Sequence, residues 1–411
     1  MKKVIKYVFF MVIVVGIAFS IAYCRSAGSK SSNIDQSMYD DLNLGPFSPA
    51  LMELQPFNDI TAVELVADIK IGWNLGNTFD ANPWSGFAAQ NPNPTVNQLE
   101  TLWVRHVTTE ANIIALKNAG FDTIRIPVSW GKAADSNYVI RADWMRRVTE
   151  IVNYAIENDM YVILNTHHDE EIFKFLDDDM IESLRAFQRI WKQIASQFKN
   201  YSEKLIFEAL NEPRTKGSTN EWRGGTPVER DNINKYYREF IKVIRNSGGN
   251  NDKRFLMITT YAASAEASAM NGLVLPDDTA DNKLIVSIHV YTPYDFALNV
   301  NSPVNTWNRE RSSDTSPIIN IFDRAYNIFV SKGIPVIMGE FGAMNKNNEA
   351  ARAEWAEFYV NYARSKGIPC IWWDNGAFTG TGELFGLINR TNNSITYPLV
   401  LEGLMKGAGV R

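Results

Sequence analysis

The sequence contains few cysteines, few histidines and no cluster of basic residues. Two cysteines in 411 residues cannot form a disulfide framework. Lys and Arg (41) are outnumbered by Asp and Glu (46), and no basic stripe appears, which argues against a nucleic-acid partner. With 25 glycines, 16 prolines and 45% hydrophobic residues, the chain is neither collagen-like nor disordered. The composition is that of a globular protein with a sizeable core.

Only one long hydrophobic run is present, from Tyr7 to Tyr23, within a stretch of thirty residues that has basic but no acidic side chains. Such a run is a secretory signal or a membrane anchor and is excluded from the fold. Ile21-Ala22-Tyr23-Cys24 resembles a bacterial lipoprotein cleavage box. Lipidation at Cys24, ordinary cleavage and an uncleaved anchor remain open, and each places the body outside the cytoplasm. We expect a signal peptide or lipoprotein signal at 1–24, a Ser-rich flexible tether at 25–44, and one catalytic domain at 45–411.

From residue 45 onward, eight short apolar runs alternate with longer amphipathic stretches whose apolar residues recur every three or four positions. Strict alternation of strand and helix predicts a parallel sheet, and eight units predict closure into a (β/α)8 TIM barrel. A doubly wound open sheet is the alternative, but no Gly-rich phosphate motif follows the first run. The predicted strands are Ile69 to Leu75, Thr123 to Val128, Tyr161 to Thr166, Leu205 to Leu210, Phe255 to Thr260, Leu284 to Val290, Pro335 to Met338 and Ile368 to Trp373.

Glu212 and Glu340 stand at the ends of the fourth and seventh predicted strands. In a barrel of this kind the carboxyl ends of the strands meet at one rim, so the two side chains are expected to face each other. Burial raises the pKa of a carboxyl group unless a cation compensates. Glycoside hydrolysis requires such a pair, one acid for the leaving oxygen and one carboxylate for the anomeric carbon. The alternative to a catalytic role is that both buried carboxylates belong to structural salt bridges.

Other strand-end residues divide the roles of the two carboxylates. We expect Arg125 to keep Glu340 ionised, because a nearby guanidinium lowers a carboxyl pKa. Tyr291 is placed to donate a hydrogen bond to the same group. His289 is expected beside Glu212, and Asn211 is expected to bond the sugar hydroxyl next to the reacting carbon.

Seven motifs in order along the chain resemble glycoside hydrolase family 5, whose members are retaining (β/α)8 hydrolases of β-linked glycans. Asn-Glu-Pro alone would be a weak signal, whereas seven motifs at successive strand ends are specific. They are Gly72-Trp73-Asn74-Leu75-Gly76-Asn77, Arg125-Ile126-Pro127-Val128, His167-His168, Asn211-Glu212-Pro213, His289-Val290-Tyr291, Gly339-Glu340-Phe341-Gly342 and Trp372-Trp373-Asp374-Asn375-Gly376.

This resemblance implies that Glu212 is the general acid/base and Glu340 the nucleophile. It also implies that the reacting sugar is surrounded by Arg125, His167, Asn211, His289, Tyr291 and Trp373. His168 and Asn74 would then contact a neighbouring sugar. The first and last motifs look most like the branch of endoglucanases that includes xyloglucan and mixed-linkage glucan hydrolases.

Aromatic residues in predicted loops or at strand ends are further candidates, because sugar rings stack on exposed aromatic faces. Trp130 and Trp84 are the ones we assign to substrate binding. Trp84 lies in an insertion at 80–94, and Trp222 lies in a second unassigned segment at 215–227.

The remaining alternatives concern metal ions and specificity. Residues 167 to 171 (His-His-Asp-Glu-Glu) crowd metal-ligand types together, but alternate residues point apart and the chain has only four histidines, so no metal and no cofactor are expected. A non-catalytic glycan-binding barrel would lack one carboxylate, and both are present. The expected activity is internal cleavage of β-1,4-glucan by a monomer, with xyloglucanase, lichenase and β-mannanase activity as alternatives.

Overall fold

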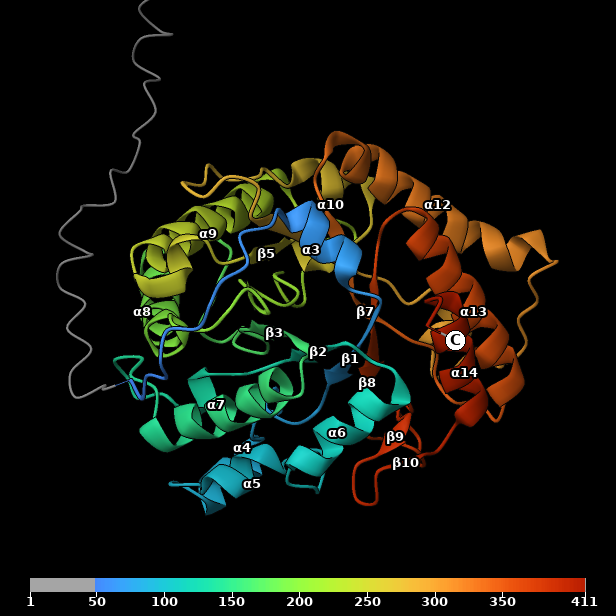
Figure 1. Cartoon of the computed structure of the whole chain (residues 1–411), viewed down its shortest axis with the longest axis horizontal. Coiled ribbons are helices and arrows are strands. Elements are labelled where there is room, and N and C mark those ends of the chain that lie inside the picture. The colour runs from blue at the N-terminus through green and yellow to red at the C-terminus, as the bar shows by residue number, and fades with distance from the viewer. Residues whose placement is uncertain (1–48, 411) are drawn as a thin grey trace, which may run out of the picture. The chain divides into compact units, whose positions relative to one another are not determined.

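The computed structural model describes residues 49–410, and their centre is a closed barrel of eight parallel strands (Figure 1). The strands follow one another around the barrel in chain order, and β1 closes it by pairing with β8 in parallel. The predicted (β/α)8 barrel is therefore confirmed. The strands are β1 (Ile71–Leu75), β2 (Thr123–Ile126), β3 (Tyr161–Asn165), β4 (Leu205–Glu208), β5 (Leu256–Thr259), β6 (Leu284–His289), β7 (Val336–Phe341) and β8 (Cys370–Asp374).

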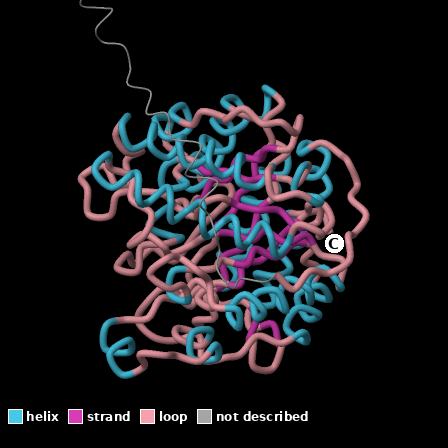
Figure 2. The backbone as a smooth tube through the Cα atoms, turned by 90° about the vertical axis from the view of Figure 1, so that its left-hand side faces the viewer, coloured by secondary structure: helices cyan, strands magenta, loops and turns pink. Residues whose placement is uncertain are grey.

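Helices surround the strands, which lie in the middle of the molecule when it is seen from the side (Figure 2). Each crossover between consecutive strands contains at least one helix, as parallel pairing requires. The helices are α3 (Ala62–Asp68), α4 (Ser85–Gln90), α5 (Val96–Glu100), α6 (Glu110–Ala119), α7 (Ala142–Glu157), α8 (Met180–Phe198), α9 (Pro227–Arg245), α10 (Ala267–Gly272), α11 (Tyr294–Ala297), α12 (Ser312–Ile328), α13 (Glu349–Ser365) and α14 (Pro398–Gly407). A short antiparallel pair, β9 (Ile388–Asn389) and β10 (Ser394–Ile395), lies between β8 and α14.

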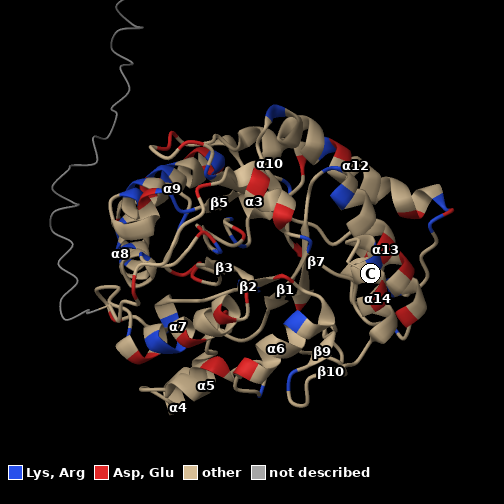
Figure 3. Cartoon of the chain, viewed as in Figure 1, with Lys and Arg blue, Asp and Glu red and all other residues tan. Residues whose placement is uncertain are grey.

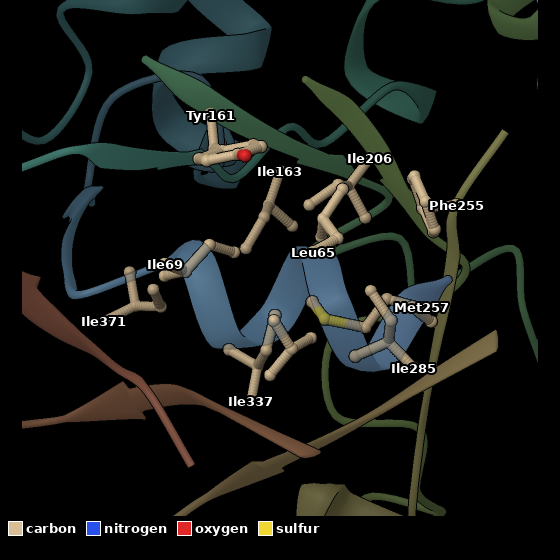
Figure 4. Packing of buried hydrophobic residues seen from close by; sticks show 12 residues of the cluster. Leu65, Ile69, Tyr161, Ile163, Ile206, Phe255, Met257, Ile285, Ile337 and Ile371 are labelled. Carbon is tan, nitrogen blue, oxygen red and sulfur yellow. The ribbon is translucent and has the colours of Figure 1, made fainter. Parts of the chain in front are cut away.

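The amino-terminal end of the barrel is filled by apolar side chains and covered by α3. Leu65 and Ile69 pack against inward-pointing residues of several strands (Figure 4). The side chain of Thr61 caps α3 by accepting from the backbone N–H of Glu64, and Glu64 accepts from Thr61 in return. We call this layer the floor; its strand residues are Tyr161, Ile163, Ile206, Met257, Ile285, Ile337 and Ile371.

Above the floor the interior changes from apolar to polar. Successive side chains of a strand alternate between its two faces, so residues two positions beyond the floor also point inward. On β3 to β7 these positions hold Asn165, Glu208, Thr259, Ser287 and Gly339, and the four with side chains are all buried. We call these residues the polar layer. It separates the apolar floor from the carboxyl ends of the strands, where the site lies.

The outer helices carry Lys and Arg among Asp and Glu (Figure 3). In residues 49–410, no helix combines the length and hydropathy needed to cross a bilayer. The expected signal at 1–24 and tether at 25–44 lie outside the described residues. They stay predictions, for which the mass of the mature N-terminal peptide is the test.

The floor gives a prediction about stability. Leu65→Ala removes a fully buried side chain from the floor and should lower the free energy of unfolding by about 2 to 5 kcal/mol. Because the site is at the other end of the barrel, kcat/KM should be unchanged. Denaturant unfolding measures the first quantity. The control is Val63→Ala on the exposed side of the same helix, and an equal loss in both variants would contradict the role of the floor.

Candidate active site

The carboxyl ends of the strands open into a cleft with a volume of about 1010 Å³. Its lining combines acidic, imidazole and aromatic side chains from the ends of β3, β4, β6, β7 and β8. This is the rim at which barrels of this kind carry their chemistry. Of the predicted residues, those that line the cleft are His167, His168, Asn211, Glu212, His289, Tyr291, Glu340 and Trp373.

Glu212 and Glu340 meet across this cleft. Glu212 lies in the loop after β4, and Glu340 lies inside β7 at a point where the register with both neighbouring strands shifts. Such irregularities redirect side chains and are common beside active sites. One carboxylate oxygen of each residue lies within 4.8 Å of the other and of a ring nitrogen of His289. Retaining glycosidases hold their two carboxyl groups about 5 to 5.5 Å apart, and inverting enzymes hold them farther apart.

Arg125 of β2 fixes the position of Glu340. Its side chain is fully buried, and Nη1 donates to Glu340 Oε1 at 2.6 Å. Nη2 donates to Asn211 Oδ1 at 2.8 Å, which leaves the NH2 group of Asn211 as the donor for a substrate hydroxyl. Tyr291 Oη donates to the other oxygen of Glu340 at 3.0 Å. The contacts expected from the sequence for Arg125 and Tyr291 are present.

Glu212 has different neighbours. His289 Nδ1 lies 3.0 Å from Glu212 Oε1, as expected from the sequence. Arg214, which the sequence analysis did not consider, donates to the backbone oxygen of Glu212 and lies 3.6 Å from Glu212 Oε2. The Glu212 carboxylate therefore has one imidazole at hydrogen-bond distance and one more distant cation.

Burial dominates the electrostatics of both carboxyl groups. It raises the pKa of Glu212, and the charges of Arg214 and His168 oppose that rise. It also raises the pKa of Glu340, which the protonated form of His289 and the guanidinium of Arg125 would lower. Arg125 thus acts in the expected direction, but the net effect on the Glu340 pKa is a rise. Two donors, Arg125 and Tyr291, stabilise the charged form of Glu340, whereas the Glu212 carboxylate has one imidazole at hydrogen-bond distance.

The three histidines of the cleft differ in charge. Burial lowers the pKa of His289 to about 4 and that of His167 well below its usual value. Burial also opposes the charge of His168, but the hydrogen bond and charge of Glu170 outweigh it and raise the His168 pKa. At neutral pH, His167 and His289 are neutral imidazoles beside the reacting centre.

A row of rings leads outward from the reacting centre along one wall. Trp373 is parallel to His167, with ring centroids 5.9 Å apart. His167 contacts His168, which in turn packs against Trp103 at 5.8 Å. Flat, partly apolar surfaces of this kind stack against sugar rings.

The structure corrects three predicted substrate contacts. Asn74 and Trp130 are fully buried and do not line the cleft. The amide of Asn74 accepts from Arg125 and donates to Gly339 O, so Asn74 supports Arg125. The indole of Trp130 donates to Asn165 O inside the core. Trp84 is exposed and packs on Phe87, outside the residues that line the cleft.

The structure also adds residues that sequence reasoning missed or, in the case of Trp222, left without an assigned role. Trp103 and Trp222 are exposed, line the cleft and lie in loops, where no periodicity separates a functional ring from a packed one. The guanidinium of Arg214 lies 4.4 Å from the Trp222 ring centre and so fixes that ring. Glu266, before α10, and Glu383, after β8, place two further carboxylates in the lining. Among these added residues, Arg214 could have been predicted from the sequence, because it directly follows the Asn211-Glu212-Pro213 motif.

In each of two groups, side chains of the types that bind metals lie close enough together to suggest a metal site. Asp80, His167 and His168 form one, and Glu212, His289 and Glu340 form the other. Asp80 already accepts from the backbone N–H groups of Asn77 and Thr78. The second group holds the two carboxylates in the hydrogen bonds described above. Both arrangements are explained by protein partners.

The geometry agrees with the comparisons with known proteins. A family model described as cellulase (glycosyl hydrolase family 5) matches residues 87–379. The chain belongs to glycosyl hydrolase family 5. Endoglucanase A of Clostridium longisporum is 44% identical to this family member over 360 residues, which are 87% of this chain and 68% of that protein.

Solved structures of family 5 are similar along most of the chain. A GH5-4 broad specificity endoglucanase from Ruminococcus champanellensis with bound cellotriose is 47% identical, with a TM-score of 0.82 over 86% of this chain and 100% of that one. A family 5 lichenase from Caldicellulosiruptor sp. F32 is 40% identical, with a TM-score of 0.80 over 88% of this chain and 99% of that one.

The pKa values of the histidines give a prediction about pH. At about pH 5.5, below the usual histidine pKa, His167 and His289 should stay neutral while His168 is protonated. Nitrogen-15 shifts of the imidazoles report this directly in a protein with four histidines. His289→Asn and His168→Asn assign one signal of each kind. A His289 signal that titrates near its usual pKa would contradict the account of the site.

Proposed function

We propose that this protein is a retaining endo-β-1,4-glucanase in which Glu340 is the nucleophile and Glu212 the general acid/base. The observation that carries the proposal is the pair of buried carboxylates with oxygens within 4.8 Å, each with its own set of partners. Retention requires this short separation, because one carboxylate must reach the anomeric carbon itself. The family relationship supports the same reaction.

In the first step Glu340 attacks the anomeric carbon and the glycosidic bond breaks. Glu212 donates its proton to the leaving oxygen, so the released chain departs as an alcohol. Arg125 and Tyr291 hold the two oxygens of Glu340 and so aim it. The NH2 group of Asn211 is oriented to bond the neighbouring sugar hydroxyl, an interaction that strengthens as positive charge develops on the ring.

In the second step Glu212, now ionised, accepts a proton from water. The hydroxide attacks the same carbon, the bond to Glu340 breaks, and the sugar is released with its original configuration. Neutral His289 with its proton on Nδ1 can donate to Glu212 Oε1, 3.0 Å away, in either protonation state of Glu212, because a protonated carboxyl group keeps one acceptor oxygen. The site therefore needs no rearrangement between the steps.

The substrate is a β-glucan chain that passes through the cleft. Trp103 and Trp222 both line the cleft in addition to the residues around the reacting sugar. A cleft of about 1010 Å³ is more than a single sugar needs, which favours cleavage inside a chain. The likeness to a lichenase favours mixed-linkage glucan as a second substrate.

The test is a comparison of viscosity with reducing ends. On a soluble cellulose derivative, viscosity should fall early, while few reducing ends have formed, because internal cuts shorten chains most. Lichenan, xyloglucan, xylan and mannan are assayed in parallel. Glu340→Gln should lower the rate on the order of 10⁵-fold, since its amide cannot form the covalent intermediate. Release of single glucose units without loss of viscosity would contradict the proposal, as would near-normal activity of Glu340→Gln.

The aromatic lining gives a prediction with a matched control. Trp222→Ala should raise KM for polysaccharide roughly two- to tenfold, because stacking on one ring contributes about 0.5 to 1.5 kcal/mol. Trp84→Ala is the control, since both rings are 57% exposed and only Trp222 lines the cleft. Initial rates across a range of polysaccharide concentrations measure KM. If Trp84→Ala had the larger effect, the substrate would run over α4 instead.

A further inference from the structure

Glu208, at the end of β4, lies beneath the catalytic groups and takes no part in the reaction as described above. Its side chain is completely buried in the polar layer. Oε2 accepts from Arg125 Nε at 2.6 Å and from Asn165 Nδ2 at 3.0 Å. Arg125 is therefore held between two carboxylates, Glu208 below and Glu340 above. It donates one hydrogen bond to each, with a nitrogen–oxygen distance of 2.6 Å.

We propose that Glu208 is a positioning residue of the active site. It fixes the guanidinium of Arg125 and shares its charge, and so sets both the position and the ionisation of the nucleophile Glu340. The inference rests on the proposed function, in which Glu340 attacks the sugar. Glu208 itself is below the cleft and touches no substrate.

The geometry of Arg125 is the first argument. A guanidinium that serves only Glu340 could rotate about its long side chain. Here Nε, Nη1 and Nη2 each have an acceptor on a different strand or loop, namely Glu208, Glu340 and Asn211. Asn74 adds a further acceptor to Nη1 at 2.9 Å. The planar donor fork is thus locked, and Glu208 is the acceptor opposite the nucleophile.

Charge balance is the second argument. One guanidinium faces two carboxylates, so its stabilisation of Glu340 is shared. Without the charge of Glu208, Arg125 would stabilise the Glu340 carboxylate more strongly, and its pKa would be lower. A more stabilised carboxylate is a weaker nucleophile. Glu208 therefore keeps the nucleophile reactive as well as in place.

Three polar side-chain atoms of the same interior region have no hydrogen-bond partner among the described residues. They are Glu208 Oε1, Ser287 Oγ and His289 Nε2, all buried. A Cβ on Gly339 would lie 2.5 Å from Ser287 Oγ and 2.9 Å from His289 Nε2, so only glycine fits between them. Unpaired buried polar atoms are rare in proteins and are typical of functional sites. A carboxylate kept only for stability would be fully paired.

The charge of Glu208 also reaches the acid/base side of the site. Burial lowers the pKa of His289, and the charges of Glu340 and Glu208 oppose this. His289 in turn contacts Glu212. The ionisable groups that face Glu208, Glu340 and Glu212 are Arg125, Tyr237, His289, Tyr291, His168, Glu170, Arg214 and Glu383.

The experiment is the pH profile of kcat/KM for Glu208→Gln. Loss of one negative charge makes neighbouring carboxyl groups easier to ionise, so the pKa values of Glu340 and Glu212 should both fall. Activity needs Glu340 ionised and Glu212 protonated, so both limbs of the bell should move to lower pH. The maximum should drop by about 100-fold, because a neutral amide oxygen holds the Arg125 guanidinium less firmly than a carboxylate does.

Two further variants separate positioning from stability. Glu239→Gln is the control, because Glu239 is a half-buried carboxylate of outer helix α9, bonded to Gln188, and its loss should leave the profile unchanged. Glu208→Asp keeps the charge but retracts it, so kcat should fall while both limbs stay near their wild-type positions. Thermal unfolding and circular dichroism establish that each variant is folded.

Several results would overturn the proposal. One is a folded Glu208→Gln variant with wild-type activity. Another is a folded Glu208→Gln variant whose activity is reduced while both limbs of its pH profile stay at their wild-type positions. If Glu208→Gln does not fold, wild-type activity of Glu208→Asp, or its failure to fold too, shows that Glu208 is structural. The kcat and kcat/KM values of each variant are expressed relative to those of the wild type, on a glycan that the wild type cleaves. A wild type inactive on every β-glucan would instead contradict the proposed function.

Discussion

The buried guanidinium of Arg125 is the interaction on which the rest of the site depends. It joins side chains from β1, β4, β7 and the loop after β4 by hydrogen bonds of 2.6 to 2.9 Å. Breaking a buried ion pair by removing one partner leaves an uncompensated charge and costs about 3 to 5 kcal/mol. The barrel therefore brings its strand ends together around one cation, and the nucleophile is placed as part of that arrangement.

Such a charged centre is compatible with a stable protein because the barrel interior is divided into layers. The floor under α3 is apolar and supplies core stability, and the polar layer above it supplies fixed partners for the catalytic groups. Gly339 leaves room where Ser287 and His289 approach β7. Exclusion of water by burial then strengthens the hydrogen bonds to Glu340 and raises the pKa of both proposed catalytic carboxyl groups. Stability and reactivity thus depend on different ends of the same strands.

Much of this arrangement follows from sequence because polar residues at the ends of apolar strands converge in a barrel. The contacts of Arg125 and Tyr291 with Glu340, and of His289 with Glu212, are predictable in this way. Side-chain direction is harder: Asn74 lies near the end of β1 and Trp130 follows β2, but both side chains are buried away from the cleft. Trp103 and Trp222 lie on loops, whose path depends on tertiary contacts. Glu208 had a visible signal, a carboxylate inside the apolar run Leu205 to Leu210, which only the partner Arg125 explains.

The central claim is that Glu340, held by Arg125, forms a covalent bond with the sugar. The most direct measurement is trapping of that intermediate with a 2-deoxy-2-fluoro cellobioside that carries a good leaving group, followed by mass spectrometry of the digested protein. The fluorine slows both steps, and the good leaving group restores the rate of the first step. The glycosyl-enzyme therefore accumulates. The account predicts one added fluorocellobiosyl group on the peptide that contains Glu340. A label on a different residue, or no label together with a product of inverted configuration, would contradict it.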